Sequence, residues 1–162
     1  MRLCTALAAA AILSISTGSA PHTWQARGVS VRLPPGWHAT ASALTPVRYP
    51  QFAFASYPLP AGDRGADGCE PKAALDGLPA SGVFIFAWEF PRSGATRAFP
   101  RRPRHFRLGH FGRYECLGPS YLLRFRAAGR YFQVHIVLGK QASRRMRGLA
   151  LHALDSLVVR RR

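Results

Sequence analysis

The segment Val83–Phe90 constrains the fold more than any other part of this chain. Seven of its eight residues are apolar, and Gly82 and Pro91 mark its two ends. A strand with one face in water alternates apolar and polar residues, whereas a strand that is buried on both faces is apolar throughout. We therefore expect this segment to be the central strand of a sheet, with the rest of the chain covering both of its faces.

Other segments carry weaker strand patterns. Residues 28–33 alternate between apolar and polar side chains, which is typical of a strand with one buried face. Residues 121–126 and 130–138 flank a short turn that contains Gly129, and this arrangement predicts a β-hairpin. The remaining candidates are residues 51–57 and, as a short strand or edge segment, residues 105–108.

Two segments have the properties of helices. Residues 72–76 follow Pro71, which is tolerated in the first turn of a helix, and Gly77 stops them. Residues 141–157 place apolar side chains at three- and four-residue spacings, as in an amphipathic helix. Hairpin-linked strands with separate helices predict an α+β fold, in which a central, mostly antiparallel sheet has helices packed on it.

Residues 1–20 have the three-part pattern of a secretory signal peptide. Arg2 gives a positive start, residues 3–15 are almost wholly apolar, and small residues up to Ala20 suit a cleavage site. An uncleaved anchor is the alternative, but 13 apolar residues fall short of the roughly 20 that a membrane span needs. The pattern predicts an exported protein with no transmembrane span after cleavage. The expected parts are a polar lead-in at 21–27, a single domain at 28–159 and a basic tail at 160–162.

The net charge is strongly positive and comes almost entirely from arginine. The chain has 23 Lys and Arg against 7 Asp and Glu, and loss of residues 1–20 would leave a charge of +15. Such a charge favours association with polyanions. Outside the cytoplasm these are anionic lipids, wall polymers, acidic glycans and stray nucleic acid. An alternative is that GC-rich coding favours arginine and the charge has no partner.

Residues 92–107 contain six arginines and no acidic residue. Guanidinium groups donate paired hydrogen bonds to phosphates and carboxylates, and the interleaved Phe99 and Phe106 could add stacking. The alternative is a solvated loop without a ligand, whose charges repel one another and keep it extended. No nucleic-acid-binding module accompanies the arginines, so we expect no sequence-specific binding of nucleic acid. The candidate anion-binding residues are Arg97, Arg101, Arg102, Arg104 and Arg107.

Cys69 and Cys116 are the two cysteines that remain after cleavage. Two cysteines in an exported chain indicate a disulfide, because the compartment is oxidising. Two buried free thiols are the alternative, because a domain of this size has enough core to fold without a crosslink.

The sequence has no recognised pattern for catalysis, metal binding or a cofactor. The G-x-S-x-G, H-E-x-x-H, C-x-x-C and phosphate-loop motifs are all absent. Glu89 and Glu115 could meet across a sheet as a glycosidase pair, but each fits better as a solvent-facing residue or an arginine partner. His135 falls on the same strand face as Gln133 and is expected on the sheet surface. We predict no catalytic residue, no metal ligand and no cofactor.

Residues 28–37, an alternating strand that runs into Pro34-Pro35-Gly36-Trp37, resemble the opening of the PsbP-like family. That family includes the extrinsic photosystem II subunit, a Ran-binding import factor and exported bacterial lipoproteins. The ending, Leu154-Asp155-Ser156-Leu157 before a last short strand, is also similar. The chain resembles in particular uncharacterised exported proteins of GC-rich bacteria. The resemblance implies an antiparallel sheet between helical layers and a docking role without a shared catalytic site. The lipobox of the lipoprotein branch is missing.

These observations lead to two expected functions. The first is an exported, non-enzymatic binding or scaffolding domain of the cell envelope, whose partner is an envelope protein or an anionic polymer. The alternative is a polyanion-binding protein that attaches to anionic lipid, wall polymer or nucleic acid through residues 92–107.

Overall fold

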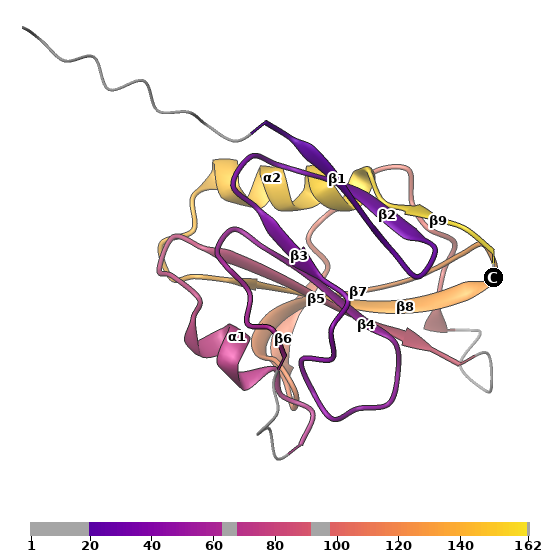
Figure 1. Cartoon of the computed structure of the whole chain (residues 1–162), viewed down its shortest axis with the longest axis horizontal. Helices are drawn as coiled ribbons and strands as arrows, with labels where there is room; N and C mark the ends of the chain where they lie inside the picture. Colours follow the sequence, from indigo (N-terminus) through magenta and orange to yellow (C-terminus); the bar gives the residue numbers. More distant parts are fainter. Residues whose placement is uncertain (1–19, 63–67, 92–97, 162) are drawn as a thin grey trace, which may run out of the picture.

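The protein is built from two antiparallel sheets and two helices, in a computed structural model that describes residues 20–62, 68–91 and 98–161 (Figure 1). The predicted signal peptide, apart from Ala20, lies outside the described residues. The elements in chain order are β1 (His22–Ala26), β2 (Val29–Leu33), β3 (His38–Thr40), β4 (Gln51–Ala55), α1 (Lys72–Asp76), β5 (Val83–Phe90), β6 (His110–Tyr114), β7 (Gly118–Ala127), β8 (Arg130–Leu138), α2 (Arg144–Asp155) and β9 (Val158–Val159). The larger sheet has the strand order β3-β4-β5-β8-β7-β6 and the smaller sheet β1-β2-β9.

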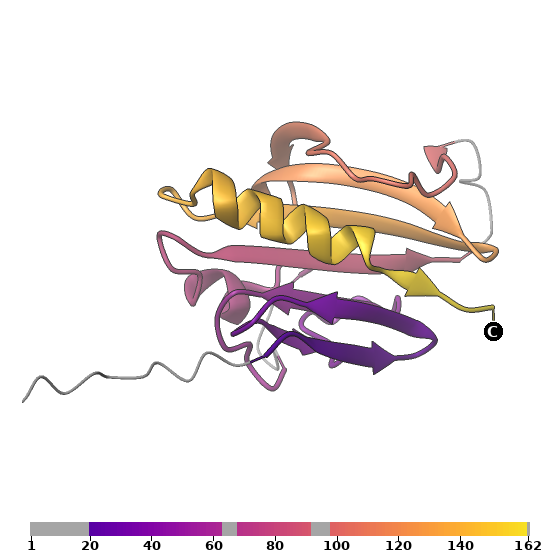
Figure 2. The same ribbon diagram turned by 90° about the horizontal axis from the view of Figure 1, so that it is seen from above.

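The larger sheet has a different cover on each face. The smaller sheet and α2 lie over one face, where Val31, Ile85 and Leu154 belong to one core cluster (Figures 1 and 2). On the other face, Leu44 and Ala74 of α1 pack against a second cluster that includes residues from β4, β5 and β8. The core is therefore divided into two layers by the larger sheet.

The predicted α+β fold, with helices packed on a central sheet, is wrong. Strands make up 40% of the structure and helices only 14%, so the fold is mostly β. The difference arises in the smaller sheet. β2 does not join the larger sheet, but pairs with β1 on one edge and with β9 on the other, where Val29 lies opposite Val159. A second sheet therefore covers much of the face that the prediction assigned to helices.

β5 is the central strand that its apolar sequence predicts. It runs from Val83 to Phe90 and pairs with β4 on one side and β8 on the other. Ile85 faces the core shared with α2, and Phe84 and Phe86 face the opposite core. The expectation that both faces are buried is confirmed.

β7 and β8 form the predicted hairpin, with a tighter turn than expected. Ala127 pairs with Arg130, so only Ala128 and Gly129 connect the two strands. These residues have φ angles of 51° and 77°. A two-residue hairpin turn of type I′ requires positive φ at both central positions, which suits the right-handed twist of the strands.

β1 and β6 are strands that the sequence pattern does not predict. β1 lies in the segment assigned to a polar lead-in, and β6 begins at His110, whereas residues 105–108 form no strand. Both are edge strands whose side chains are mostly exposed or half-buried. An edge strand with few buried side chains needs little apolar alternation, so its pattern is weak.

The two helices lie where the sequence predicts them. α1 begins at Lys72 and ends at Asp76, and α2 lies inside the predicted limits 141–157. The N-cap of α2 is Ser143, whose hydroxyl accepts a hydrogen bond from the Met146 N–H at 3.2 Å. In the described part of the chain, no helix is long and apolar enough to cross a membrane.

Cys69 and Cys116 form the predicted disulfide, with their Cα atoms 5.0 Å apart. The bond joins the segment before α1 to the turn between β6 and β7. It therefore attaches the cover of one sheet face to the edge of that sheet.

A buried ion pair closes one end of the core under the smaller sheet. Arg130 donates two parallel hydrogen bonds to the Glu89 carboxylate, at 2.8 Å and 2.6 Å, and the side chains are only 7% and 11% exposed. A third donor of Arg130 reaches the carbonyl of Arg160 at 3.3 Å, which ties the chain after β9 to the larger sheet. The sequence left Glu89 as either a solvent-facing residue or a partner of an arginine, and the structure shows that it is the partner of Arg130.

We expect Glu89→Gln to lower the free energy of unfolding by about 3 kcal/mol, because Arg130 then keeps a buried charge without its counter-ion. Asp76→Asn is the matched control, since the Lys72–Asp76 pair is 64% exposed on both sides and its loss should cost less than about 1 kcal/mol. Urea unfolding of both variants measures the difference. Equal losses would show that the Arg130–Glu89 pair does not stabilise the end of the core.

Candidate anion-binding surface

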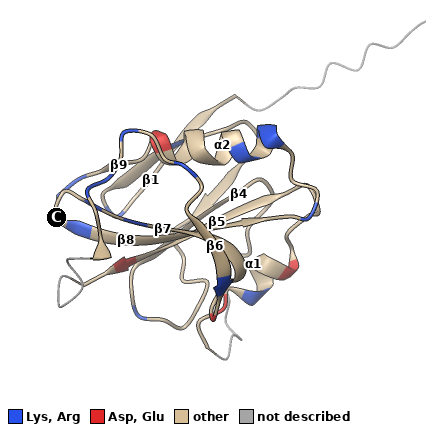
Figure 3. Cartoon of the chain, turned by 180° about the vertical axis from the view of Figure 1, so that it is seen from behind, with Lys and Arg blue, Asp and Glu red and all other residues tan. Residues whose placement is uncertain are grey.

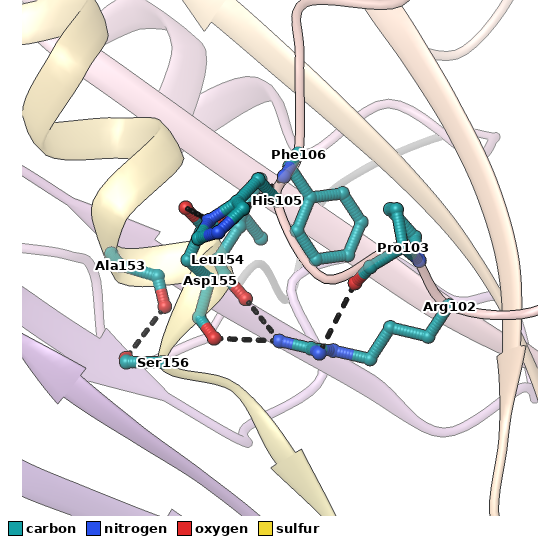
Figure 4. A network of polar contacts seen from close by, with 8 residues as sticks. All are labelled: Arg102, Pro103, His105, Phe106, Ala153, Leu154, Asp155 and Ser156. Atoms are coloured by element: carbon teal, nitrogen blue, oxygen red, sulfur yellow. Dashed lines mark hydrogen bonds and ion pairs between the residues drawn. The ribbon is translucent and has the colours of Figure 1, made fainter.

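The loop that carries the predicted arginines is attached to the C-terminus of α2 (Figure 4). One guanidinium nitrogen of Arg102 donates to the carbonyl oxygens of Leu154 and Asp155, at 3.1 Å and 2.7 Å. The last carbonyls of a helix lack the N–H donors of a following turn, and a cation there also interacts favourably with the helix dipole. The guanidinium lies over the Phe106 ring at 5.2 Å, and desolvation by burial lowers the pKa of Arg102.

Asp155 fixes the same loop through its carboxylate. One oxygen accepts a hydrogen bond from the Phe106 N–H at 2.6 Å, and the other lies 3.2 Å from Nδ1 of His105. The Phe106 side chain is buried and packs edge-on against Phe125 at 5.2 Å. The loop is therefore held by a guanidinium, a carboxylate and an apolar anchor together.

Residues 100–102 of this loop run beside β7. The Arg102 N–H donates to the carbonyl of Arg126 at 2.9 Å, and the Arg126 N–H donates to the carbonyl of Pro100 at 2.8 Å. Arg101 and Arg126 stand directly opposite each other in this parallel bridge. The larger sheet, and not a free loop, therefore determines where Arg101 lies.

The predicted anion-binding residues divide into three groups. Arg101, Arg104 and Arg107 are exposed, so their guanidinium groups can reach a ligand. Arg102 is bonded to the end of α2 and serves the structure of the loop. Arg97 lies outside the described residues.

β7 contributes two further arginines that the sequence pattern did not assign to this surface. Arg124 and Arg126 are exposed, whereas Phe125 between them is buried, so both arginines project from the face opposite to Phe125. Arg101 projects from that face as well, because it is paired with Arg126. Figure 3 shows basic residues on β7 and on the neighbouring loop in blue. The alternation Arg124-Phe125-Arg126 was the signal available in the sequence.

Two hollows border these side chains. One, of about 480 Å³, is lined by Arg101, Arg126 and the turn between β7 and β8. The other, of about 340 Å³, is lined by Arg107, Arg124 and apolar Leu123, and Arg101 lines this hollow too. We call Arg101, Arg107, Arg124 and Arg126 the arginine surface.

No acidic side chain among the described residues forms an ion pair with the arginine surface. The three ion pairs found in that part of the chain join Lys72 to Asp76, His105 to Asp155 and Arg130 to Glu89. Arg124 instead donates to the neutral amide oxygen of Gln133, at 3.1 Å. The charges of the surface are therefore not compensated by this part of the chain, and a bound anion would reduce their repulsion.

Ser120 and His135 form a buried contact that resembles part of a catalytic triad. The Ser120 hydroxyl lies 3.0 Å from Nδ1 of His135, and the side-chain amide nitrogen of Gln133 lies 3.0 Å from Nε2. The amide oxygen of Gln133 accepts from Arg124, so its NH₂ group faces the imidazole and donates to Nε2. Nδ1 then carries the proton and donates to Ser120. The imidazole in this arrangement is not a base for the serine.

The prediction that His135 lies on the sheet surface is wrong, because the side chain is only 1% exposed. The rings of Tyr114 and Trp88 lie 5.1 Å and 5.7 Å from the imidazole. Tyr114 belongs to β6, the edge strand that the sequence did not predict. Because the sequence pattern did not predict β6, it gave no sign that Tyr114 covers the His135 imidazole.

The other candidates for catalysis or metal binding do not lie together in one site. Glu89 is bonded to Arg130, and Glu115 is exposed in the turn after β6, so they do not form a carboxylate pair. His105 contacts Asp155, and Nδ1 of His110 lies 3.3 Å from the Tyr114 hydroxyl. Within residues 20–62, 68–91 and 98–161, no group of three His, Cys, Asp or Glu side chains could hold a metal ion.

Comparisons of the chain with protein-family models, with curated proteins and with solved structures find no match. The resemblance of residues 28–37 to the PsbP-like family therefore stays a prediction.

Arg102→Met should lower the free energy of unfolding by about 2 kcal/mol, because the carbonyls of Leu154 and Asp155 are left without a charged donor. Arg104→Met, at an exposed neighbouring position, should change it by less than about 0.5 kcal/mol. Urea unfolding measures both values, and hydrogen exchange should show faster exchange at the Phe106 N–H in Arg102→Met only. Equal stability of the two variants would contradict the proposed attachment of the loop.

The pKa of His135 is lowered to about 4 by desolvation and, to a lesser extent, by the positive charge of Arg124. The native state therefore stays unprotonated at pH values where an unfolded histidine, with a pKa of about 6.5, takes up a proton. The stability that this group contributes is complete above pH 6.5 and is lost as the pH falls towards 4, by an amount on the order of 3 kcal/mol. His135→Gln should remove this part of the pH dependence in urea unfolding between pH 7.5 and pH 4.5. An unchanged pH dependence would show that His135 titrates alike in both states.

Proposed function

We propose that this protein is an exported binding protein that attaches to anionic polymers of the cell envelope through the arginine surface. The observation that carries the proposal is the placement of four exposed guanidinium groups on one sheet edge and its attached loop, without acidic partners among the described residues. The disulfide supports export, since such bonds persist mainly in oxidising compartments. The signal pattern of residues 1–20 supports the same compartment.

The shape of the surface favours a polymer over a single small anion. Its two hollows share Arg101, and the other arginines are divided between them, so the charged groups are spread over more than one cavity. A polymer with repeated charges can bind several arginines at once and releases counterions at each of them. The resulting affinity depends strongly on salt even when each interaction is weak.

A protein partner is the second candidate, and a separate apolar hollow favours it. This hollow, of about 560 Å³, is lined by Leu75, Leu117 and Val137, beside the disulfide and at the other end of β8 from the arginine surface. A docking role on envelope proteins is also what the resemblance to the PsbP-like family implies. The two candidates use different surfaces, so substitutions separate them.

The proposed function is tested by removing three arginines from the surface and three from elsewhere. The first variant is Arg101→Ser, Arg107→Ser and Arg126→Ser, which leaves Arg124 and its bond to Gln133 in place. The matched control is Arg144→Ser, Arg145→Ser and Arg147→Ser on the exposed face of α2, with the same change in charge. Binding to polyphosphate and to anionic vesicles is measured over a range of salt concentrations, with the full chain produced in a host that exports it.

We expect the surface variant to bind more weakly, and the slope of log K against log[salt] to fall by about 0.7–0.9 for each arginine that no longer binds a phosphate. The control should keep most of the wild-type affinity and slope. Equal weakening in the two variants would show that net charge alone drives binding. Unchanged binding by the surface variant would overturn the proposal and leave the apolar hollow as the next candidate.

A further inference from the structure

Three side chains form a row across the end of the larger sheet. Arg101 lies opposite Arg126 in the bridge between residues 100–102 and β7, and Arg126 lies opposite Tyr131 of β8. Directly opposed residues of neighbouring strands project from the same face. All three line the hollow of about 480 Å³, together with the turn Ala128-Gly129.

The position of the two arginines is unfavourable without a ligand. Like charges that stand directly opposite each other in a sheet destabilise it, and no acidic group among the described residues offsets this pair. The Arg126 backbone is nevertheless bonded to Pro100 and Arg102, the residues on either side of Arg101, at 2.8 Å and 2.9 Å, and these bonds keep the two arginines opposite each other. The pair therefore presents many N–H donors towards one hollow, with a repulsion that a bound anion would relieve.

The wall of the hollow is rigid on the β8 side. Tyr131 is only 9% exposed, and its ring packs edge-on against Phe99 at 5.7 Å. Phe99 also contacts Phe90 at 5.9 Å, so an aromatic cluster supports this side. A ligand group bound between the arginines would meet a fixed surface.

We infer that this hollow is a phosphate-binding site, at which one phosphate group of the anionic polymer accepts hydrogen bonds from both Arg101 and Arg126. This inference rests on the proposed function and names the chemical class of its ligand. A carboxylate offers two oxygens in one plane, whereas a phosphate group of a polymer is tetrahedral and also has bridging oxygens, so two guanidinium groups can approach it from different directions. A phosphate group at the end of a polymer or in a monoester, which has a second ionisation, also carries more charge to offset the two cations.

Substitution by lysine distinguishes a phosphate site formed by two guanidinium groups from attraction by net charge alone. Arg101→Lys with Arg126→Lys keeps the net charge but removes the planar pairs of donors that match phosphate oxygens. Arg144→Lys with Arg145→Lys, on exposed positions of α2, is the matched control. Each protein, as the full exported chain, is titrated with inorganic polyphosphate and with polyglutamate at one fixed salt concentration.

We expect the wild type to prefer polyphosphate over polyglutamate. The Arg101/Arg126 lysine variant should lose about tenfold in affinity for polyphosphate while its affinity for polyglutamate stays the same. The control should keep the wild-type preference. Thermal unfolding of each variant without ligand checks that the fold is intact.

The outcomes distinguish this inference from the proposed function. If the wild type binds neither polymer, the proposed function fails and the inference fails with it. If the wild type binds both polymers and the lysine variant weakens both alike or neither, the proposed function stands and the phosphate site is overturned. A preference of the wild type for polyglutamate would also overturn it.

Discussion

The burial of β5 on both faces is the constraint on which the rest of the structure depends. A strand with aromatic and branched side chains on each face needs two covers, and these covers determine the role of every other segment. The smaller sheet and α2 supply one cover, while α1 and the segment around Leu44 supply the other. The arginine surface lies at an edge of the same sheet, where β7 has residues 100–102 as its neighbour.

The elements that the sequence predicts well are those that bury side chains. β5, the alternating strand β2 and the apolar face of α2 were identifiable from apolar spacing, and α1 from Pro71 and Gly77 at its ends. The strands β1 and β6 were not, because each lies at the edge of its sheet and has no fully buried side chain, so its apolar alternation is weak. The predicted fold class was wrong for a related reason. Whether β2 joins the main sheet or a second sheet depends on backbone pairing with β1 and β9, which side-chain periodicity does not encode.

The sequence indicated that arginines would form the candidate surface, but it did not indicate which arginines belong to it. The run of arginines in residues 92–107 identified a loop that carries part of the candidate surface, yet its composition could not distinguish Arg102, bonded to the end of α2, from exposed Arg101 beside it. The distinction depends on Asp155 and the last carbonyls of α2, about 50 residues later in the chain. Arg124 and Arg126 join the surface only because residues 100–102 lie beside β7. Contacts between segments far apart in the chain therefore decided which arginines serve structure and which can serve binding.

The pairing of Val29 with Val159 also has a consequence for the order of folding. The β7–β8 hairpin has partners close in sequence and can form early, whereas β2 gains its second neighbour only from a strand 130 residues further along the chain. Contacts between such distant residues require a long loop to close and tend to form late. The cover over one face of β5 is therefore complete only after β9 has been synthesised. We therefore expect the smaller sheet to assemble after the larger one, with the edge of β2 open until the end of the chain is available.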